Sequence, residues 1–487
     1  MIKMEAGLRR SFPVMTVAVT SLGFALVQLD GSILNIALSE IGNSLGAGIN
    51  DLQWTVDAYF VAFAVLLLSA GSLSDRWGAR RTFVSGFIVF SAASLACGVA
   101  PNVGELIIAR AVQGVGAALL VPCSLALLND ACRGDAGPRA RAVGLWTAAG
   151  GVGIAAGPIL GGLLIGLLGW RSIFFVNLPI GVAGIWLTLR FLDQPAPAQK
   201  KRGLDLTGQT LAAVALLGVV WAIIETGPSG WHSPLVLSGI ILAVTSGMGF
   251  IIVERKASDP AVPIDLFRNM EVSTTMLVGF AVHSLMIGVT FGFALYFQRV
   301  LSFSTVETGI AFLPFGLMVI AANVAGGRCV ARFGLRGPMC IGLVIAATGC
   351  AVLLGIDRDT TYLAILPGQL LIRLGIGLVV PAITTGMLAA VPSARSGVAS
   401  GALNATRQTG GAVGVAMFGA LMTSDIVQGI RIALVISGLL LLLTAIISLA
   451  AMRVAPAHDA ERVGAYQEAD PCRVRSADVL PERRHAS

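Results

Sequence analysis

One acidic residue, Asp30, lies within the first long apolar stretch of the chain, the run 12–38. The run is long enough to cross a bilayer, which takes about 20 apolar residues. A carboxylate in hydrocarbon costs roughly 2.5–3.5 kcal/mol on insertion scales, so it is expected to face a bundle interior or a water-filled cavity. We hypothesise that Asp30 takes up and releases protons in a transporter. The alternative is a carboxyl that only hydrogen-bonds between helices.

Arg110 occupies the outer part of another apolar run, 104–128, at a depth comparable with that of Asp30. An arginine inside a membrane stays charged and needs an acid, carbonyl groups or water beside it. A guanidinium near a carboxyl favours the charged form of the acid. Asp30 and Arg110 are therefore the predicted proton-coupling residues. The alternative for Arg110 is a structural role through hydrogen bonds to carbonyl groups.

Other polar residues in apolar runs are candidates for contacts with a substrate, and Asn35 and Gln113 are two of them. Asp57, one turn inside the run 54–74, either contributes to such a site or is a carboxylate at the water interface. Arg407 either lines a cavity or binds carbonyls or lipid headgroups. Three more residues receive no role from the sequence: Arg373, His283 and Glu225.

The composition explains why so few polar residues lie in these runs. Of 487 residues, 56% are hydrophobic and 12% charged, where soluble domains have about 25% charged residues, and the mean hydropathy is +0.85. We predict an all-α polytopic membrane protein with 14 transmembrane helices. The runs are 12–38, 54–74, 82–100, 104–128, 141–167, 171–192, 206–225, 234–253, 272–297, 307–327, 338–356, 361–390, 397–422 and 430–452.

Most of the 33 Lys and Arg fall between alternate runs, on the side of the N-terminus. The positive-inside rule therefore places both termini in the cytoplasm of a multi-pass protein of the cell membrane. The tail 454–487 is polar and predicted to be disordered. No basic stretch is interleaved with aromatic residues, which argues against nucleic acid as a partner, and the seven cysteines show no metal-ligand spacing.

Two loops repeat one another. The loop 71–81 aligns with 327–336 through Gly71, Arg76, Gly78 and Arg80, whereas Asp75 meets an alanine. We predict two six-helix halves, 1–192 and 272–453, around a linker with two extra helices, 193–271. Such repeats place the binding site at their interface near the middle of the membrane.

A run of glycines at four-residue intervals marks the fifth apolar run: Gly153, Gly157 and Gly161. Small residues at this spacing let two membrane helices approach closely, and the neighbouring Pro158 favours a kink. The spacing therefore predicts a tightly packed helix pair.

The loop 71–81 resembles the signature loop of the major facilitator superfamily. Stretches resembling its fourteen-span drug/proton antiporter branch are 29–38, 54–59, 110–114, 153–162, 169–179, 296–301 and 402–411. The resemblance implies a cytoplasmic gate formed by Gly71, Asp75, Arg76, Gly78 and Arg80, and an antiporter motif formed by Gly153, Gly157, Pro158 and Gly161. The alternative for the loop is a basic segment that only sets the orientation of the chain.

The resemblance implies proton-driven export of drugs or antibiotics, with no cofactor or metal. The scarcity of charge in the spans favours a lipophilic small molecule, exchanged for protons across the lipid bilayer by a monomer. An exporter dedicated to one self-made antibiotic or metabolite is the alternative, and a non-transporting sensor is a third reading. An enzyme is disfavoured because the sequence shows no metal-ligand cluster, nucleophile–base pair or Walker loop.

Overall fold

The computed structural model describes residues 2–132, 136–192, 205–257, 264–391 and 396–451, and this part of the chain is helical with no strand. The predicted all-α class is therefore confirmed, while the tail 454–487 and part of the linker, 193–204, lie outside the described residues. The first helices are α1 Ile2–Leu45, α2 Ile49–Trp77, α3 Ala79–Val99, α4 Val103–Ala131, α5 Ala136–Leu168, α6 Ser172–Phe175 and α7 Asn177–Phe191.

The linker region contributes a pair of helices, α8 Leu206–Ser229 and α9 Pro234–Lys256, and a short 3-10 helix, η1 Ile264–Arg268. The remaining elements are α10 Met270–Arg299, α11 Thr305–Phe333, α12 Arg336–Val352, η2 Leu353–Gly355, α13 Tyr362–Ala389, α14 Ser396–Met422 and α15 Ile426–Ala451.

Twelve of the described helical segments are long and apolar enough to cross a membrane, with α6 and α7 counted as one. The two other expected runs, 54–74 and 397–422, fall on α2 and α14, helices of 29 and 27 residues that carry more polar side chains. The count of fourteen spans therefore stays a prediction.

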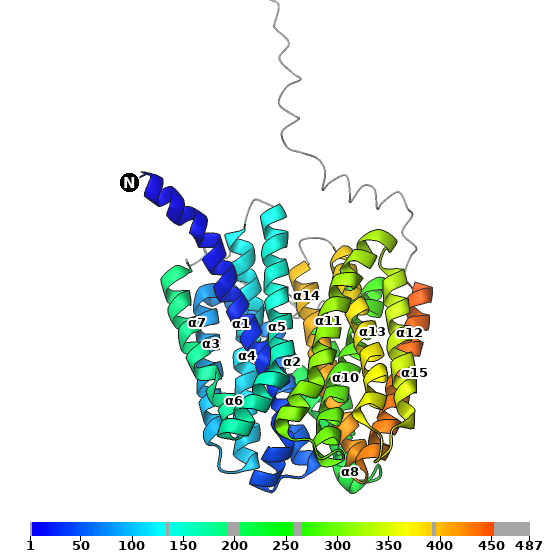
Figure 1. Ribbon diagram of the computed structural model, residues 1–487. Helices are drawn as coiled ribbons and strands as arrows, with labels where there is room; N and C mark the ends of the chain where they lie inside the picture. Colours follow the sequence, from blue (N-terminus) through cyan, green and yellow to red (C-terminus); the bar gives the residue numbers. More distant parts are fainter. Residues whose placement is uncertain (1, 133–135, 193–204, 258–263, 392–395, 452–487) are drawn as a thin grey trace, which may run out of the picture.

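The helices form two groups that lie side by side, α1–α7 and α10–α15 (Figure 1). The groups meet where α2 packs on α14 and α5 packs on α11, and α8 covers the seam between α2 and α14. We call the end of the bundle where α1 begins the near end, at the top of Figure 1, and the opposite end the far end.

The two aligned loops have matching geometry at the near end. Gly78 and Gly334 both adopt positive φ, +88° and +76°, which glycine tolerates without strain. Arg80 donates to the carbonyls of Thr188 and Leu189 at the end of α7, and Arg336 donates to the Leu449 carbonyl at the end of α15. Cations at helix C-termini are stabilising. The repeat seen in the sequence thus corresponds to two equivalent helix caps.

Of the expected gate residues, Gly71 lies inside a helix, because α2 continues to Trp77 and the turn is at Gly78. The side chain of Asp75 lies outside the described part of the structure.

The contacts between the two groups gather toward the far end. Gln298 of α10 donates to the Ile36 carbonyl of α1 at 2.9 Å, and Gln53 of α2 donates to the Ala416 carbonyl of α14 at 2.7 Å. Several glycines toward the near end of α2, α5, α11 and α14 have open space where a Cβ would lie: Gly71, Gly144, Gly151, Gly327 and Gly397. These hydrogen bonds between the groups close the far end of the bundle.

Candidate functional site

Asp30 and Arg110 form an ion pair inside the first group of helices. The Arg110 Nη1 atom donates to Asp30 Oδ2 at 2.6 Å, and each side chain is 1% exposed. Arg110 also donates to the Thr55 carbonyl of α2 at 3.2 Å, so α1, α2 and α4 are tied together at this point. Asp30 and Arg110 were expected at similar depth in the membrane, and the structure places them in direct contact.

Amide side chains complete the surroundings of the carboxylate. Gln113 Nε2 donates to Asp30 Oδ1 at 2.7 Å, and Asn177 Nδ2 donates to the same oxygen at 2.8 Å. Ser94 accepts from both amides, at 2.7 and 3.2 Å. We call this set, Asp30, Arg110, Gln113, Asn177 and Ser94, the buried cluster. Both oxygens of the carboxylate are therefore hydrogen-bonded.

Two members of the buried cluster, Asn177 and Ser94, are not predicted from the sequence. Asn177 opens α7 and Ser94 lies late in α3, and nothing in their spacing from Asp30 indicated contact. For Asn177 two signals were available: its place in the stretch 169–179, which resembles the antiporter branch, and an amide in an apolar run, where it needs partners. Gln113 was expected to contact substrate, whereas the structure assigns its side chain to Asp30.

Tyr59 separates the buried cluster from the centre of the molecule. The Arg110 guanidinium lies 4.3 Å from the centre of the Tyr59 ring, a cation–π contact. Tyr59 also donates to the Val27 carbonyl of α1 at 3.4 Å. In this conformation the acid is enclosed in the interior of the bundle, one of the two surroundings expected from the sequence, and does not line a cavity.

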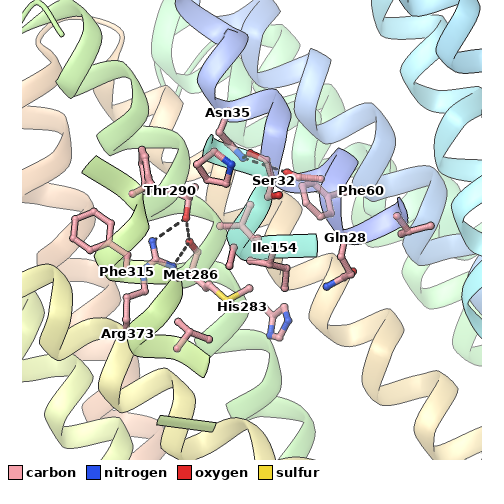
Figure 2. Close-up of a pocket in the computed structure, with 18 of the residues that line it drawn as sticks. Gln28, Ser32, Asn35, Phe60, Ile154, His283, Met286, Thr290, Phe315 and Arg373 are labelled. Atoms are coloured by element: carbon pink, nitrogen blue, oxygen red, sulfur yellow. Dashed lines mark hydrogen bonds between the residues drawn. The ribbon is translucent and has the colours of Figure 1, made fainter. Parts of the chain in front are cut away.

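A cavity lies between the two groups of helices and encloses about 930 Å³, open solvent at its mouth included. Its wall is mostly apolar, with Phe60, Phe312 and Phe315 among the large side chains. Figure 2 shows that α1 contributes Gln28, Ser32 and Asn35, while Thr290 and Arg373 lie opposite. Asn35 lines this cavity, and its contact with substrate stays a prediction; Tyr59 lines the cavity on the side of the buried cluster.

The glycines of α5 lie against α1 beside Asp30. A Cβ added at Gly153 would lie 2.6 Å from the Ala25 carbonyl oxygen, one at Gly157 would overlap Ser32, and one at Gly161 would lie 2.8 Å from Ile33. The predicted close helix pair is therefore α1 with α5. Beyond it, Pro158 meets Gly309 of α11 across the seam.

Asp57 is fully buried, so it is not the interfacial carboxylate that the sequence allowed. Neither carboxylate oxygen has a hydrogen-bond partner among the described residues. Asp57 lies between Gln53 and Phe60 on the α2 face that packs against α14, since residues three and four apart share a helix face. It does not line the cavity.

Arg407 lies on α14, half-buried, and donates to the Thr384 hydroxyl of α13 at 2.9 Å. Of the expected gate residues, Arg76 is exposed, and Arg80 caps α7 as described above. No group of three or more His, Cys, Asp or Glu that could hold a metal ion is found in the part of the chain that the structure describes.

A model of the major facilitator superfamily matches residues 20–415. The chain belongs to the major facilitator superfamily. This family consists of transporters rather than enzymes, and its match spans both groups of helices and the cavity between them.

Named members of the superfamily are similar to this chain over most of its length. The multidrug resistance protein Stp of Mycobacterium tuberculosis (strain ATCC 25618 / H37Rv) is 36% identical over 417 residues, covering 84% of this chain and 76% of the relative. The methylenomycin A resistance protein of Streptomyces coelicolor is 35% identical over 445 residues, covering 91% and 93%. The inward-open xylose transporter XylE from E. coli has the same fold, with a TM-score of 0.64 and 15% identity over 93% of this chain and all of that one.

Proposed function

We propose that this superfamily member exports amphipathic drugs or antibiotics from the cytoplasm in exchange for protons. The similarity to a multidrug resistance protein and to an antibiotic resistance protein supports the substrate class. The apolar, aromatic-lined cavity between the helix groups supports it independently, because ligand pockets combine apolar walls with a few placed polar groups.

The topology of this exporter is proposed to have fourteen spans, with α2 and α14 added to the twelve most apolar segments. Both helices pack at the centre of the bundle, where more polar side chains are tolerated. Lys and Arg concentrate at the near end, so we place that end and both termini in the cytoplasm. The functional halves are proposed as 1–192 and 272–453. One chain forms the whole cavity, which supports a monomer.

The observation that carries proton coupling is the buried ion pair of Asp30 and Arg110. Breaking a buried pair by removing one partner typically costs about 3–5 kcal/mol, because the other charge is left uncompensated. A proton on Asp30 removes the negative charge of the pair in the same way. The state of the pair and the arrangement of α1, α2 and α4 are therefore coupled.

Helix α1 connects the buried cluster to both the cavity and the far-end closure. Asp30 lies on the same helix as Ser32 and Asn35 in the cavity wall, and as Ile36, whose carbonyl accepts from Gln298. Release of the proton from Asp30 as substrate binds would move α1, loosen this bond and open the far end, and protonation of Asp30 there would restore it. The structure corresponds in this scheme to the state that faces the cytoplasm, with Asp30 and Arg110 in contact.

The remaining predicted residues receive secondary roles in the scheme. Asn35 contacts substrate in the cavity, and Asp57 acts at the contact of α2 with α14 rather than in the cavity itself, while Arg407 of α14 lies on the substrate's path from the cytoplasm. The loop at Gly78, with Arg80 as an anchor on α7, forms part of the cytoplasmic gate. The glycine face of α5 keeps α1 in place when the site is empty.

Drug efflux in everted membrane vesicles with an imposed pH gradient tests the proposal. With one proton exchanged per substrate, each pH unit supports at most about a tenfold concentration ratio, since one pH unit is worth 1.36 kcal/mol. Wild type is expected to build up such a ratio. Asp30→Asn is expected to equilibrate substrate without accumulating it, whereas Asp359→Asn, an exposed acid in the far-end loop, behaves as wild type. Full accumulation by Asp30→Asn at normal abundance would refute proton coupling through this residue.

A further inference from the structure

The second group of helices holds basic side chains in its interior without an acid to match them. Within 272–453 the sequence has four acidic residues, and all lie in far-end loops or at the start of α11: Glu307, Asp357, Asp359 and Asp425. The interior positions instead carry Arg373, Arg407 and His283. This differs from the first group, where the buried Arg110 is paired with Asp30.

Arg373 lines the central cavity and is 6% exposed. Its Nη2 atom donates to the Thr290 hydroxyl at 2.9 Å and its Nη1 atom to the Met286 carbonyl at 3.4 Å, as Figure 2 shows. Its Nε atom has no partner among the described residues. Two neutral acceptors leave the charge of the guanidinium uncompensated, and an arginine inside a membrane protein does not lose that charge.

Two further hydrogen-bond donors, His283 of α10 and Arg407 of α14, lie along α10 on the near-end side of Arg373. His283 lines the cavity, and its Nδ1 atom has no partner among the described residues. The stem of Arg407 lies 3.7 Å from the position that a Cβ at Gly279 would take. Positions 279, 283, 286 and 290 recur at helical spacing and share one face of α10. We call Arg407, His283 and Arg373 the basic track.

We propose that the basic track binds the anionic group of the exported substrate, a carboxylate or phenolate, with Arg373 as the counter-ion in the cavity. The inference rests on the proposed function and names the substrate class of the same cavity. No Asp or Glu is among the residues that line the cavity, and Asp57 lies outside it. A guanidinium suits a carboxylate because it can donate two parallel hydrogen bonds.

The apolar body of such a substrate has a matching surface. Phe312 and Phe315 of α11 line the same cavity as Arg373, and Phe60 lies in its wall on α2. A molecule with an anionic head and an aromatic body would place the head beside Arg373 and the body among these rings. Arg407, nearer the cytoplasmic end, would attract the anion on entry.

The test uses two probes with one body and different charge, 1-pyrenebutyrate and its neutral amide, 1-pyrenebutanamide. Binding to the purified full-length chain in an uncharged detergent is measured by pyrene fluorescence. Wild type is expected to prefer the carboxylate by about tenfold or more, the factor supplied by a modest charge-assisted hydrogen bond. Arg373→Gln is expected to lose this preference while its affinity for the amide stays unchanged. Arg358→Gln, at an exposed far-end arginine, keeps the preference.

An equal preference in wild type and Arg373→Gln would overturn the proposal, as would a wild type that favours the amide. If Arg373→Gln binds neither probe, Arg373→Lys decides, because it keeps the charge. Preference for the carboxylate in that variant supports the proposal, and amide binding without a charge preference refutes it. Proton-driven efflux in vesicles is scored separately, so the inference can fail while the proposed function stands, and the reverse.

Discussion

Replacing Asn177 tests whether the buried cluster controls the proton on Asp30. Asn177→Leu removes a 2.8 Å hydrogen bond to Asp30 Oδ1 and leaves Gln113 as the donor to that oxygen. A hydrogen bond to a charged group contributes about 1.5–3 kcal/mol. With 1.36 kcal/mol per pH unit, the half-maximal pH of export should move upward by about one to two units, because the neutral acid needs this donor less.

The assay is initial export rate in everted vesicles across a range of external pH, with abundance measured in parallel. Asn404→Leu is the matched control, since Asn404 bonds only to the Ser400 carbonyl of its own helix, α14, in the described structure. An unchanged pH profile for Asn177→Leu, at normal abundance, would refute the role given to the buried cluster. An equal shift in Asn404→Leu would show that the effect is unspecific.

Two further variants test the packing of the first group of helices. Gly157→Ala is expected to abolish most export while the protein still inserts, because its Cβ would overlap Ser32 of α1 and overpacking costs about 1–3 kcal/mol. Gly151→Ala is the control and should export normally, since its Cβ meets open space. Full activity of Gly157→Ala would contradict the close contact of α1 with α5. Arg80→Ala is expected to lower the melting temperature of the purified protein by removing the cap of α7, a loss of about 0.3–1 kcal/mol. An equal decrease in Arg81→Ala, where the neighbouring arginine is exposed, would argue against the cap.

The sequence predicts which helices exist and which of their residues are costly to bury, but not how neighbouring helices are rotated. The sequence placed Asp30 and Arg110 at similar depth, and they are in contact in the structure, where two opposite charges at one depth have few other partners. Ser94 and Asn177 were missed because each is a modest polar residue whose importance depends on which side of its helix faces α1.

The same limit explains the enclosed position of the acid. Nothing in the sequence shows which way Tyr59 points, and it packs over the Arg110 guanidinium between the buried cluster and the cavity. The position of Asp57 was equally ambiguous. A residue one turn from the end of an isolated span lies at the water interface, but here α14 covers α2 and Asp57 is buried. Helix spacing was more informative for the glycines of α5, since close approach requires only the absence of side chains.

Proton release on substrate binding tests the central claim most directly. Purified protein in weakly buffered detergent solution is mixed with an exported drug, and the change in pH is recorded with an indicator dye. The wild type and Asp359→Asn are expected to release protons as substrate binds, and Asp30→Asn, which binds the same drug, is expected to release none. Undiminished proton release by Asp30→Asn would contradict the exchange of a proton on Asp30 for substrate.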